Sequence, residues 1–300
     1  MPENLTSAKA VQAILTRHGL SPLKSLGQNF LIDANIQQKI VAAGALTKDD
    51  LVVEIGPGLG ALTAGLIDKA GMVIAVEYDR GLYSILKERY GAVQNLQLAN
   101  LDFLKSDLES LCGQYVRQGF QLKVMANLPY YITSPAIFKI IESKLNWGRL
   151  IFLVQKEVGD RICAKAGSHE YGAMTVLLNY FGQVEKIMNV PRTVFFPAPQ
   201  VDSALVRIEA REAAGGQDGN PKNFDFYPYL RRVVQAGFGQ RRKTILNALA
   251  PFEELFGGKS ALKNFLTQLE IHPERRGETL QLEEFMLIAK EVYERENPKT

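Results

Sequence analysis

Short apolar segments alternate with amphipathic ones from Leu51 onward, and this alternation constrains the fold more than any other feature of the chain. Apolar runs without polar interruption are typical of strands that are buried on both faces of a sheet. Strands separated by helices indicate an α/β fold with a mostly parallel sheet. We therefore expect a Rossmann-like domain with strands at 51–55, 73–77, 96–102, 122–126, 150–154 and 204–208, and helices at 61–67 and 82–87.

A change in composition divides the chain near residue 213. Residues 213–221 are rich in Gly, Asp, Asn and Pro and poor in apolar side chains, which is typical of a linker. Beyond them the strand patterns stop, and helical periodicity covers 229–249, 260–269 and 282–293. We expect an α/β domain over 1–212, whose N-terminal extension over 1–30 holds a helix at 7–17, then a linker over 213–222 and a small all-helical domain over 223–300.

Composition argues against several classes of protein. The chain is 46% hydrophobic and 22% charged, as in ordinary globular proteins. No apolar run approaches the roughly 18 residues of a membrane-spanning helix, and the first residues do not resemble a secretory signal. Two cysteines and three scattered histidines provide neither a disulfide framework nor metal-ligand spacing. We expect a cytoplasmic protein with no membrane partner and no metal ion. The net charge of +3 permits nucleic-acid binding without arguing for it.

A glycine loop, Glu54-Ile55-Gly56-Pro57-Gly58-Leu59-Gly60, lies between the first predicted strand and the first helix. Its G-x-G-x-G spacing differs from the G-x-G-x-x-G of dinucleotide-binding proteins. Glu77 closes the second strand 21 residues after Gly56 (77 − 56), close to the offset at which an acid meets a ribose. Asp102 closes the third strand. Either acid alone is more often a solvated strand end, but three strand ends in register favour a nucleotide site.

The ligand of that site is better predicted by what the loop lacks. No Lys-Ser or Lys-Thr phosphate anchor follows the glycines, and Glu54 precedes them directly. A negative charge there suits a cation and repels a pyrophosphate. S-adenosylmethionine, an adenosine with a sulfonium and no phosphates, therefore fits better than NAD or ATP. A dehydrogenase is disfavoured on the same grounds.

The segment Asn127-Leu128-Pro129-Tyr130 follows an apolar strand, at the edge where open α/β sheets bind their ligands. An amide oxygen accepts hydrogen bonds from an amino group, and an aromatic ring stacks on a flat base. The alternative is a tight turn with a packed tyrosine. With the glycine loop upstream, the segment indicates methylation of an amine.

Seven motifs together resemble those of the ribosomal RNA adenine dimethyltransferases, specifically the small-subunit (KsgA-type) branch. They lie in the family's order at 26–31 (Leu-Gly-Gln-Asn-Phe-Leu), 54–60, 76–77, 101–102, 127–130, 195–203 (Phe-Phe-Pro-Ala-Pro-Gln-Val-Asp-Ser) and 238–244 (Phe-Gly-Gln-Arg-Arg-Lys-Thr). The resemblance implies a class I methyltransferase with a seven-stranded sheet. It implies an S-adenosylmethionine pocket lined by Asn29, Leu31, Gly56, Gly58, Glu77, Asp102 and Asn127.

The chemistry expected at the other end of the site is methyl transfer to adenine. The Asn127 side-chain oxygen and the Leu128 carbonyl are the natural acceptors for the two amine N–H groups, and Pro129 fixes the turn. Tyr130 is expected to stack on one face of the base. The resemblance assigns the other face to Phe195, for which plain core packing is the alternative.

Basic residues cluster in the predicted helical domain at Arg231, Arg232, Arg241, Arg242 and Lys243. Such clusters supply phosphate contacts in RNA-binding proteins. A solvated helix face, or a brace between the two domains, remains an open alternative for them.

The resemblance implies dimethylation of two adjacent adenosines in the 3′-terminal hairpin of small-subunit (16S) rRNA, on an assembling small subunit late in its biogenesis, by a monomeric enzyme. One alternative is a large-subunit rRNA adenine methylase of the erythromycin-resistance type. Another is a ribosome assembly factor without catalytic activity. The segment 238–243 favours the small-subunit branch, and the intact set of Glu77, Asp102, Asn127 and Tyr130 argues against lost catalysis.

Overall fold

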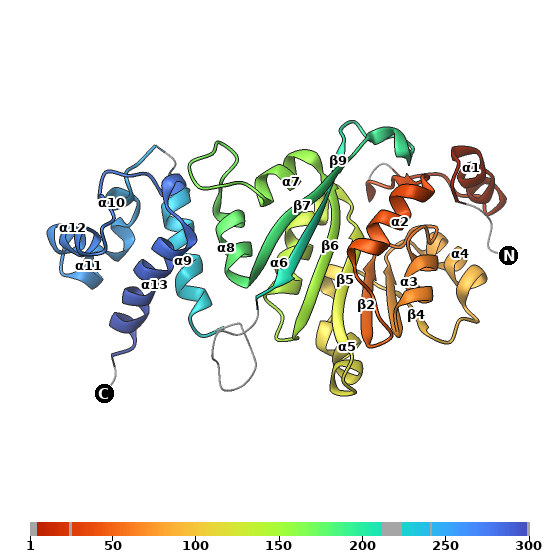
Figure 1. Cartoon of the computed structure of the whole chain (residues 1–300), viewed down its shortest axis with the longest axis horizontal. Helices are drawn as coiled ribbons and strands as arrows, with labels where there is room; N and C mark the ends of the chain where they lie inside the picture. The colour runs from red at the N-terminus through yellow and green to blue at the C-terminus, as the bar shows by residue number, and fades with distance from the viewer. Residues whose placement is uncertain (1–4, 24–25, 212–223, 241, 299–300) are drawn as a thin grey trace. The chain divides into compact units, whose positions relative to one another are not determined.

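The computed structural model describes residues 5–23, 26–211, 224–240 and 242–298. Contacts between Cα atoms divide the chain into two compact units (Figure 1). The sheet unit comprises the described parts of Met1–Gly159 and Glu185–Ala210, and the helical unit those of Asp160–Val184 and Arg211–Thr300. Within the described segments, no helix has the length and apolar character needed to cross a bilayer.

The sheet unit is built on a seven-stranded sheet of order β4-β3-β2-β5-β6-β9-β7. Neighbours from β4 to β6 pair in parallel, and β9 pairs antiparallel with β6. The mostly parallel α/β sheet expected from the sequence is confirmed. The strands are β2 (Asp50–Ile55), β3 (Met72–Glu77), β4 (Leu96–Asn100), β5 (Gln121–Asn127), β6 (Trp147–Gln155), β7 (Gly182–Val190) and β9 (Ser203–Ala210).

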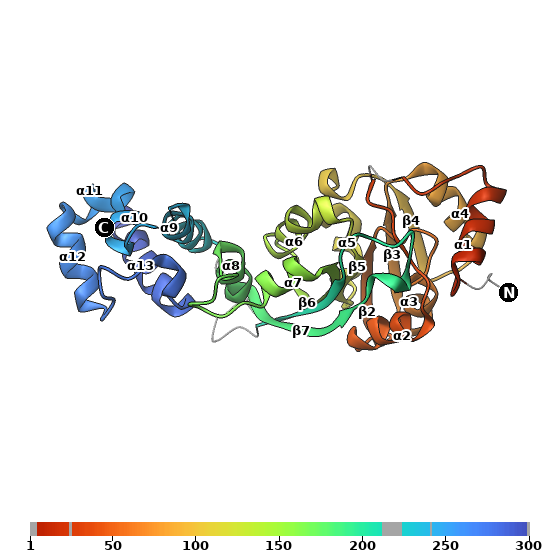
Figure 2. The same ribbon diagram turned by 90° about the horizontal axis from the view of Figure 1, so that it is seen from above.

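Helices cover both faces of this sheet (Figure 2). On one side lie α2 (Ala34–Ala43) and α3 (Thr63–Lys69), and on the other α5 (Leu108–Arg117) and α6 (Thr133–Ile141). Ile40 and Leu66 join the sheet residues Val52, Met125 and Ile151 in one buried cluster. Burial of a large aliphatic side chain contributes about 1.5–3 kcal/mol, so this layer supplies much of the unit's stability.

The N-terminal extension forms part of the sheet unit. Its helix α1 (Ala8–Arg17) packs through Val11, Ile14 and Leu15 against Leu82 and Ile85 of α4 (Arg80–Tyr90). Further on, β1 (Phe30–Leu31) pairs antiparallel with β8 (Phe195–Phe196), with Leu31 opposite Phe195. Segments more than 160 residues apart in the sequence are thereby joined in a second, two-stranded sheet.

The third predicted strand and the first predicted C-terminal helix differ from the structure in ways that local capping explains. The third strand ends at Asn100 rather than Asp102, because the Asp102 carboxylate caps the next turn, η2 (Phe103–Lys105), by accepting from Leu104 N at 2.9 Å. The segment 229–249 is not one helix but two. α9 (Tyr227–Gly239) ends before Gln240, and α10 (Ile245–Ala248) begins after Thr244, whose hydroxyl accepts from Asn247 N.

The helical unit contains α8 (Ala173–Phe181), α9, α10, α11 (Glu253–Phe256), α12 (Lys259–Gln268) and α13 (Leu282–Glu296), while α7 (Lys156–Ile162) crosses the division. The helical C-terminal region expected from the sequence is confirmed. Tyr180 and Phe181 of α8 pack on Tyr227 of α9, with ring centroids 6.0 and 4.8 Å apart. These contacts group 160–184 with the C-terminal helices. The predicted linker at 213–222 lies outside the described residues.

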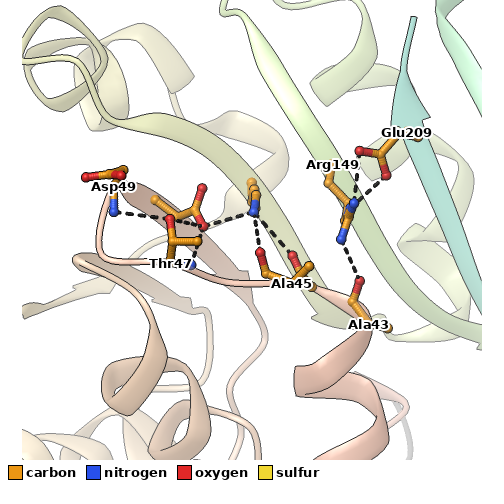
Figure 3. A network of polar contacts seen from close by, with 9 residues as sticks. Ala43, Ala45, Thr47, Asp49, Arg149 and Glu209 are labelled. Atoms are coloured by element: carbon orange, nitrogen blue, oxygen red, sulfur yellow. Dashed lines mark hydrogen bonds and ion pairs between the residues drawn. The ribbon is translucent and has the colours of Figure 1, made fainter.

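A buried polar network lies at the end of the sheet where its parallel strands begin (Figure 3). Lys123 Nζ donates to Asp50 Oδ2 at 2.9 Å and to the carbonyls of Gly44 and Ala45. Thr47 N also donates to Asp50 Oδ2, at 2.6 Å. The ammonium thus has three acceptors in a site that water barely reaches, since the two side chains are 10% and 2% exposed.

Candidate active site

A cavity of about 390 Å³ lies in the sheet unit, where β2, β3 and β5 end. That volume falls within the range of small-molecule and cofactor sites. The ten side chains or glycines predicted for the cofactor and the target base all line it: Asn29, Leu31, Gly56, Gly58, Glu77, Asp102, Asn127, Leu128, Tyr130 and Phe195. The structure therefore brings the predicted residues together in one cavity.

The glycine loop needs its glycines for conformation and for space. Gly56, Gly58 and Gly60 have φ angles of 66°, 62° and 90°, in the left-handed region that other residues rarely adopt. At Gly60 an added Cβ would lie 2.6 Å from the Tyr90 ring, and the Tyr90 hydroxyl donates to the Gly60 carbonyl at 3.3 Å. The positive φ angles and the contact with Tyr90 together favour this conformation of the loop.

Glu77 ends β3 with its carboxylate fixed by main-chain donors. Oε2 accepts from Gly58 N at 3.0 Å, and Oε1 accepts from Asp79 N at 2.9 Å. Burial raises the pKa of Glu77 to about 7, although both hydrogen bonds favour the charged form. Each carboxylate oxygen keeps a further lone pair that can accept from a ligand hydroxyl.

Glu54 corrects one step of the sequence-based argument. Its Oε2 accepts from the Thr63 hydroxyl at 2.6 Å, and burial raises its pKa to about 8. Burial therefore favours the neutral carboxyl in the absence of a ligand, whereas the sequence-based argument treated Glu54 as a negative charge. The sequence could not show this because the cause is complete burial by tertiary packing.

Asp102 lies on the loop after β4. Its Oδ1 accepts from Leu104 N, while its Oδ2 is 3.8 Å from Lys105 Nζ, beyond hydrogen-bonding distance. One carboxylate oxygen thus shapes the loop, and the other can accept from a ligand amino group in the cavity that Asp102 lines.

Asn127, the last residue of β5, is oriented by the N-terminal segment. Its Nδ2 donates to the main-chain carbonyl of Asn29 at 3.1 Å, and Asn29 Nδ2 donates to the Gly27 carbonyl at 3.0 Å. A carbonyl can only accept, so the nitrogen of the Asn127 amide must face Asn29. The amide oxygen is left as the acceptor for a ligand. The sequence alone gave no sign of this contact across 98 positions.

The two aromatic residues predicted to hold the base have different surroundings. Tyr130 opens the turn η3 (Tyr130–Ile132), and its hydroxyl lies 3.4 Å from Ser203 Oγ. Phe195 is 4% exposed and belongs to the main hydrophobic cluster while it also lines the cavity. Core packing and a place in the site are therefore compatible for Phe195.

Other lining residues were not predicted. Tyr78 and Tyr131 line the cavity with 59% and 58% of their surface exposed, and each follows a predicted site residue directly. Phe103 and Leu104 line it next to Asp102. The sequence signal that could have identified these four residues is their position beside Glu77, Tyr130 and Asp102. Across the described segments, no group of three or more His, Cys, Asp or Glu side chains could hold a metal ion.

The basic residues predicted to contact RNA lie in the helical unit. Arg232 forms a two-pronged ion pair with Glu296, at 2.7 and 2.9 Å, and stacks over the Tyr229 ring. Its guanidinium is thus engaged within the unit. Arg231 is exposed on α9, and Arg242 and Lys243 are exposed on the turn before α10. Arg241 lies outside the described residues.

The sequence matches a known protein family along most of its length. Residues 21–294 match the family described as ribosomal RNA adenine dimethylase. A Pelotomaculum thermopropionicum protein named ribosomal RNA small subunit methyltransferase A is 45% identical over 290 residues, 95% of this chain and 96% of that protein. One of the same name from Bacillus mycoides is 41% identical over 288 residues, 96% and 97% of the two chains.

A solved structure also resembles this chain. A crystal structure of a dimethyladenosine transferase from Plasmodium falciparum aligns with a TM-score of 0.73 and 27% identity, over 89% of this chain and 98% of that chain. The family match spans nearly the whole sequence, and the named relatives exceed 40% identity. This chain belongs to the ribosomal RNA adenine dimethylase family.

Proposed function

We propose that this protein dimethylates the exocyclic amino groups of two adjacent adenosines in the 3′-terminal hairpin of small-subunit (16S) rRNA, with S-adenosylmethionine as methyl donor. The observation that carries the proposal is the Asn127 amide, whose nitrogen is held by Asn29 so that its oxygen serves the cavity. The relatives that share 41–45% identity bear the name ribosomal RNA small subunit methyltransferase A, which supports the small-subunit substrate over the large.

The cavity has acceptors where the adenosine part of the cofactor needs them. Glu77, with a lone pair remaining on each oxygen, would accept from the ribose hydroxyls, and Asp102 Oδ2 would accept from the adenine amino group. Main-chain groups of Gly56 and Gly58 would lie against the cofactor, because no side chain keeps it at a distance. When bound, S-adenosylmethionine supplies an electrophilic methyl group on its sulfonium.

The residues at the end of β5 hold the target amine. The adenine amino group is a poor nucleophile because its lone pair is delocalised into the ring. Asn127 Oδ1 and the Leu128 carbonyl accept its two N–H groups, which keeps the amine where the lone pair can point at the methyl group. No strong base is needed, since the nitrogen becomes acidic once alkylated. Positioning of this kind can supply several kcal/mol, up to about 7–11.

The proposal also covers the roles of the two domains, the oligomeric state of the enzyme and the place where it acts. We assign catalysis to residues 1–212 and the positioning of RNA to residues 223–300, with Arg242 and Lys243 as exposed phosphate contacts. The enzyme acts as a cytoplasmic monomer on an assembling small subunit, late in its biogenesis. Exposed cations of this type would make RNA affinity fall with salt.

Phe195 provides a test of the base-stacking part of the site. We expect Phe195→Leu, which keeps most of the packing volume, to lower kcat/KM for the RNA by about 5- to 100-fold because base–aromatic stacking is worth roughly 1–3 kcal/mol. The affinity for S-adenosylhomocysteine should change less than about twofold. Steady-state kinetics and calorimetry measure the two quantities. Phe196→Leu, on the neighbouring residue of β8, is the matched control, and an equal loss in both variants would refute stacking by Phe195.

The pKa of Glu77 predicts a pH dependence of cofactor binding. In the free protein this pKa is raised to about 7, and ribose hydroxyls favour the charged carboxylate. Binding is therefore favoured as pH rises through 7, and the Kd of S-adenosylhomocysteine should fall about tenfold between pH 6 and pH 8. Glu77→Gln should bind more weakly and lose this slope. Glu54→Gln is the control for the other buried carboxyl. If the Kd of Glu77→Gln still falls with pH, the assignment of the pH dependence to Glu77 is wrong.

The decisive experiment is a transfer assay. The protein is incubated with labelled S-adenosylmethionine and either small or large ribosomal subunits that lack the adenine methyl groups, and the modified nucleosides are analysed by mass spectrometry. We expect dimethyladenosine in small-subunit RNA only. Label in large-subunit RNA would overturn the proposed substrate, and no label in either would overturn the proposed activity.

A further inference from the structure

Lys139 contacts the loop that presents Asp102, although it lies on a different element. It projects from α6, the helix that directly follows the turn Asn127–Ile132, and it is half-buried. Its Nζ donates to the Leu104 carbonyl at 3.0 Å and to the Ser106 carbonyl. The same ammonium lies 5.9 Å from the centre of the Phe103 ring, within the range of a cation–π contact.

These contacts hold the loop at three residues, Phe103, Leu104 and Ser106. The loop's own bonds lie within residues 102–106: Lys105 N and Ser106 N donate to the Asp102 carbonyl, and Asp102 Oδ1 accepts from Leu104 N. The Leu104 and Ser106 carbonyls are instead tied to α6 by Lys139. Main-chain carbonyls that point together repel one another unless a donor lies between them. Lys139 supplies that donor as a full charge, and hydrogen bonds to charged groups are the stronger class.

We infer that Lys139 is a positioning residue for adenine recognition, which fixes the 102–106 loop so that Asp102 Oδ2 is aimed at the amino group of the cofactor's adenine. The inference rests on the proposed function, in which Asp102 accepts from that group. Lys139 contacts neither cofactor nor substrate in this role. It gives the site its preference for adenine over a purine with oxygen at position 6, because a misplaced carboxylate no longer distinguishes a donor from an acceptor.

The test compares two ligands that differ only at that position, S-adenosylhomocysteine and S-inosylhomocysteine. We expect Lys139→Met to raise the Kd of S-adenosylhomocysteine by about tenfold, the size of one lost charged hydrogen bond. The Kd of S-inosylhomocysteine should change by less than about twofold. The ratio of the S-inosylhomocysteine Kd to the S-adenosylhomocysteine Kd should fall accordingly. The kcat at saturating S-adenosylmethionine should stay within about twofold of the wild-type value. Lys139→Arg keeps the cation and should restore most of the ratio.

Two control variants distinguish a failure of the positioning role from a failure of the proposed cofactor site. Lys144→Met removes an exposed lysine from the segment just after α6 and should change neither Kd. Asp102→Asn should weaken S-adenosylhomocysteine, and no change there would overturn the proposed cofactor site itself. If Asp102→Asn weakens binding but Lys139→Met leaves the ratio unchanged, the positioning role is wrong. Should Lys139→Met not fold, as judged by circular dichroism, the ratio measured on Lys139→Arg and Lys139→Gln decides: an unchanged ratio in Lys139→Gln overturns the inference.

Discussion

Replacing Asn127 with alanine is expected to lower kcat for rRNA methylation by about 10²–10³-fold, comparable to the loss of a preorganised hydrogen-bonding group in other active sites. The reason is that in the proposed site the amide oxygen accepts from the reacting amine, whereas Glu77, Asp102 and the glycine loop provide most of the proposed contacts with the cofactor. The Kd of S-adenosylhomocysteine should therefore rise less than about fivefold. Single-turnover kinetics with saturating cofactor, together with calorimetry, measure the two effects separately.

Asn127→Asp sharpens the same test. The aspartate retains an acceptor for the amine but loses the donor to the Asn29 carbonyl, which lies 3.1 Å from Asn127 Nδ2. Two acceptors at that distance repel each other, so the carboxylate should turn away and the rate should fall nearly as far as in Asn127→Ala. Asn95→Ala is a matched control, because that amide also donates to main-chain carbonyls, those of Ile67 and Ala70.

The outcome that would contradict this role is specific. Equal losses in kcat and in cofactor affinity would place Asn127 among the cofactor-binding residues instead. An Asn127→Asp variant with nearly full activity would show that the contact with Asn29 does not orient the group.

The strands that could be predicted from the sequence are those whose apolar residues form an uninterrupted run. β2, β5 and β6 are buried on both faces, and uninterrupted apolar residues indicated them. β7 was missed because it lies at the edge of the sheet, where exposed residues such as Glu185 and Lys186 interrupt the pattern. The two-residue pairing of β1 with β8 has no local pattern, since tertiary contacts alone define it.

The site was predictable where one strand end carries one functional side chain. Glu77 and Asn127 end their strands, and Asp102 follows two residues after the end of β4. All three were found in this way, and all three line the cavity. Asn29 came only from the resemblance, and Phe195 was an aromatic candidate that the resemblance also assigned. Nothing local in the sequence shows that these two residues meet the same cavity. The raised pKa of Glu54 could not be foreseen, since it depends on burial that no sequence pattern encodes.

The second large effect concerns stability. Lys123→Met should lower the free energy of unfolding by about 3–5 kcal/mol, because it leaves the Asp50 carboxylate buried without its cation. The side chain of Met fills similar space, so packing changes little. Denaturant unfolding can be followed through Trp147, which is the chain's one tryptophan and is fully buried in β6, next to β5.

Two comparisons decide whether the charge is responsible. Arg149→Met removes a cation from the same region, but its partner Glu209 is 42% exposed, so a loss of only about 1 kcal/mol is expected. Asp50→Asn added to Lys123→Met removes the orphaned charge. It keeps an acceptor for Thr47 N. The double variant should therefore be more stable than Lys123→Met alone. If it is equally unstable, lost packing rather than an unpaired charge explains the effect.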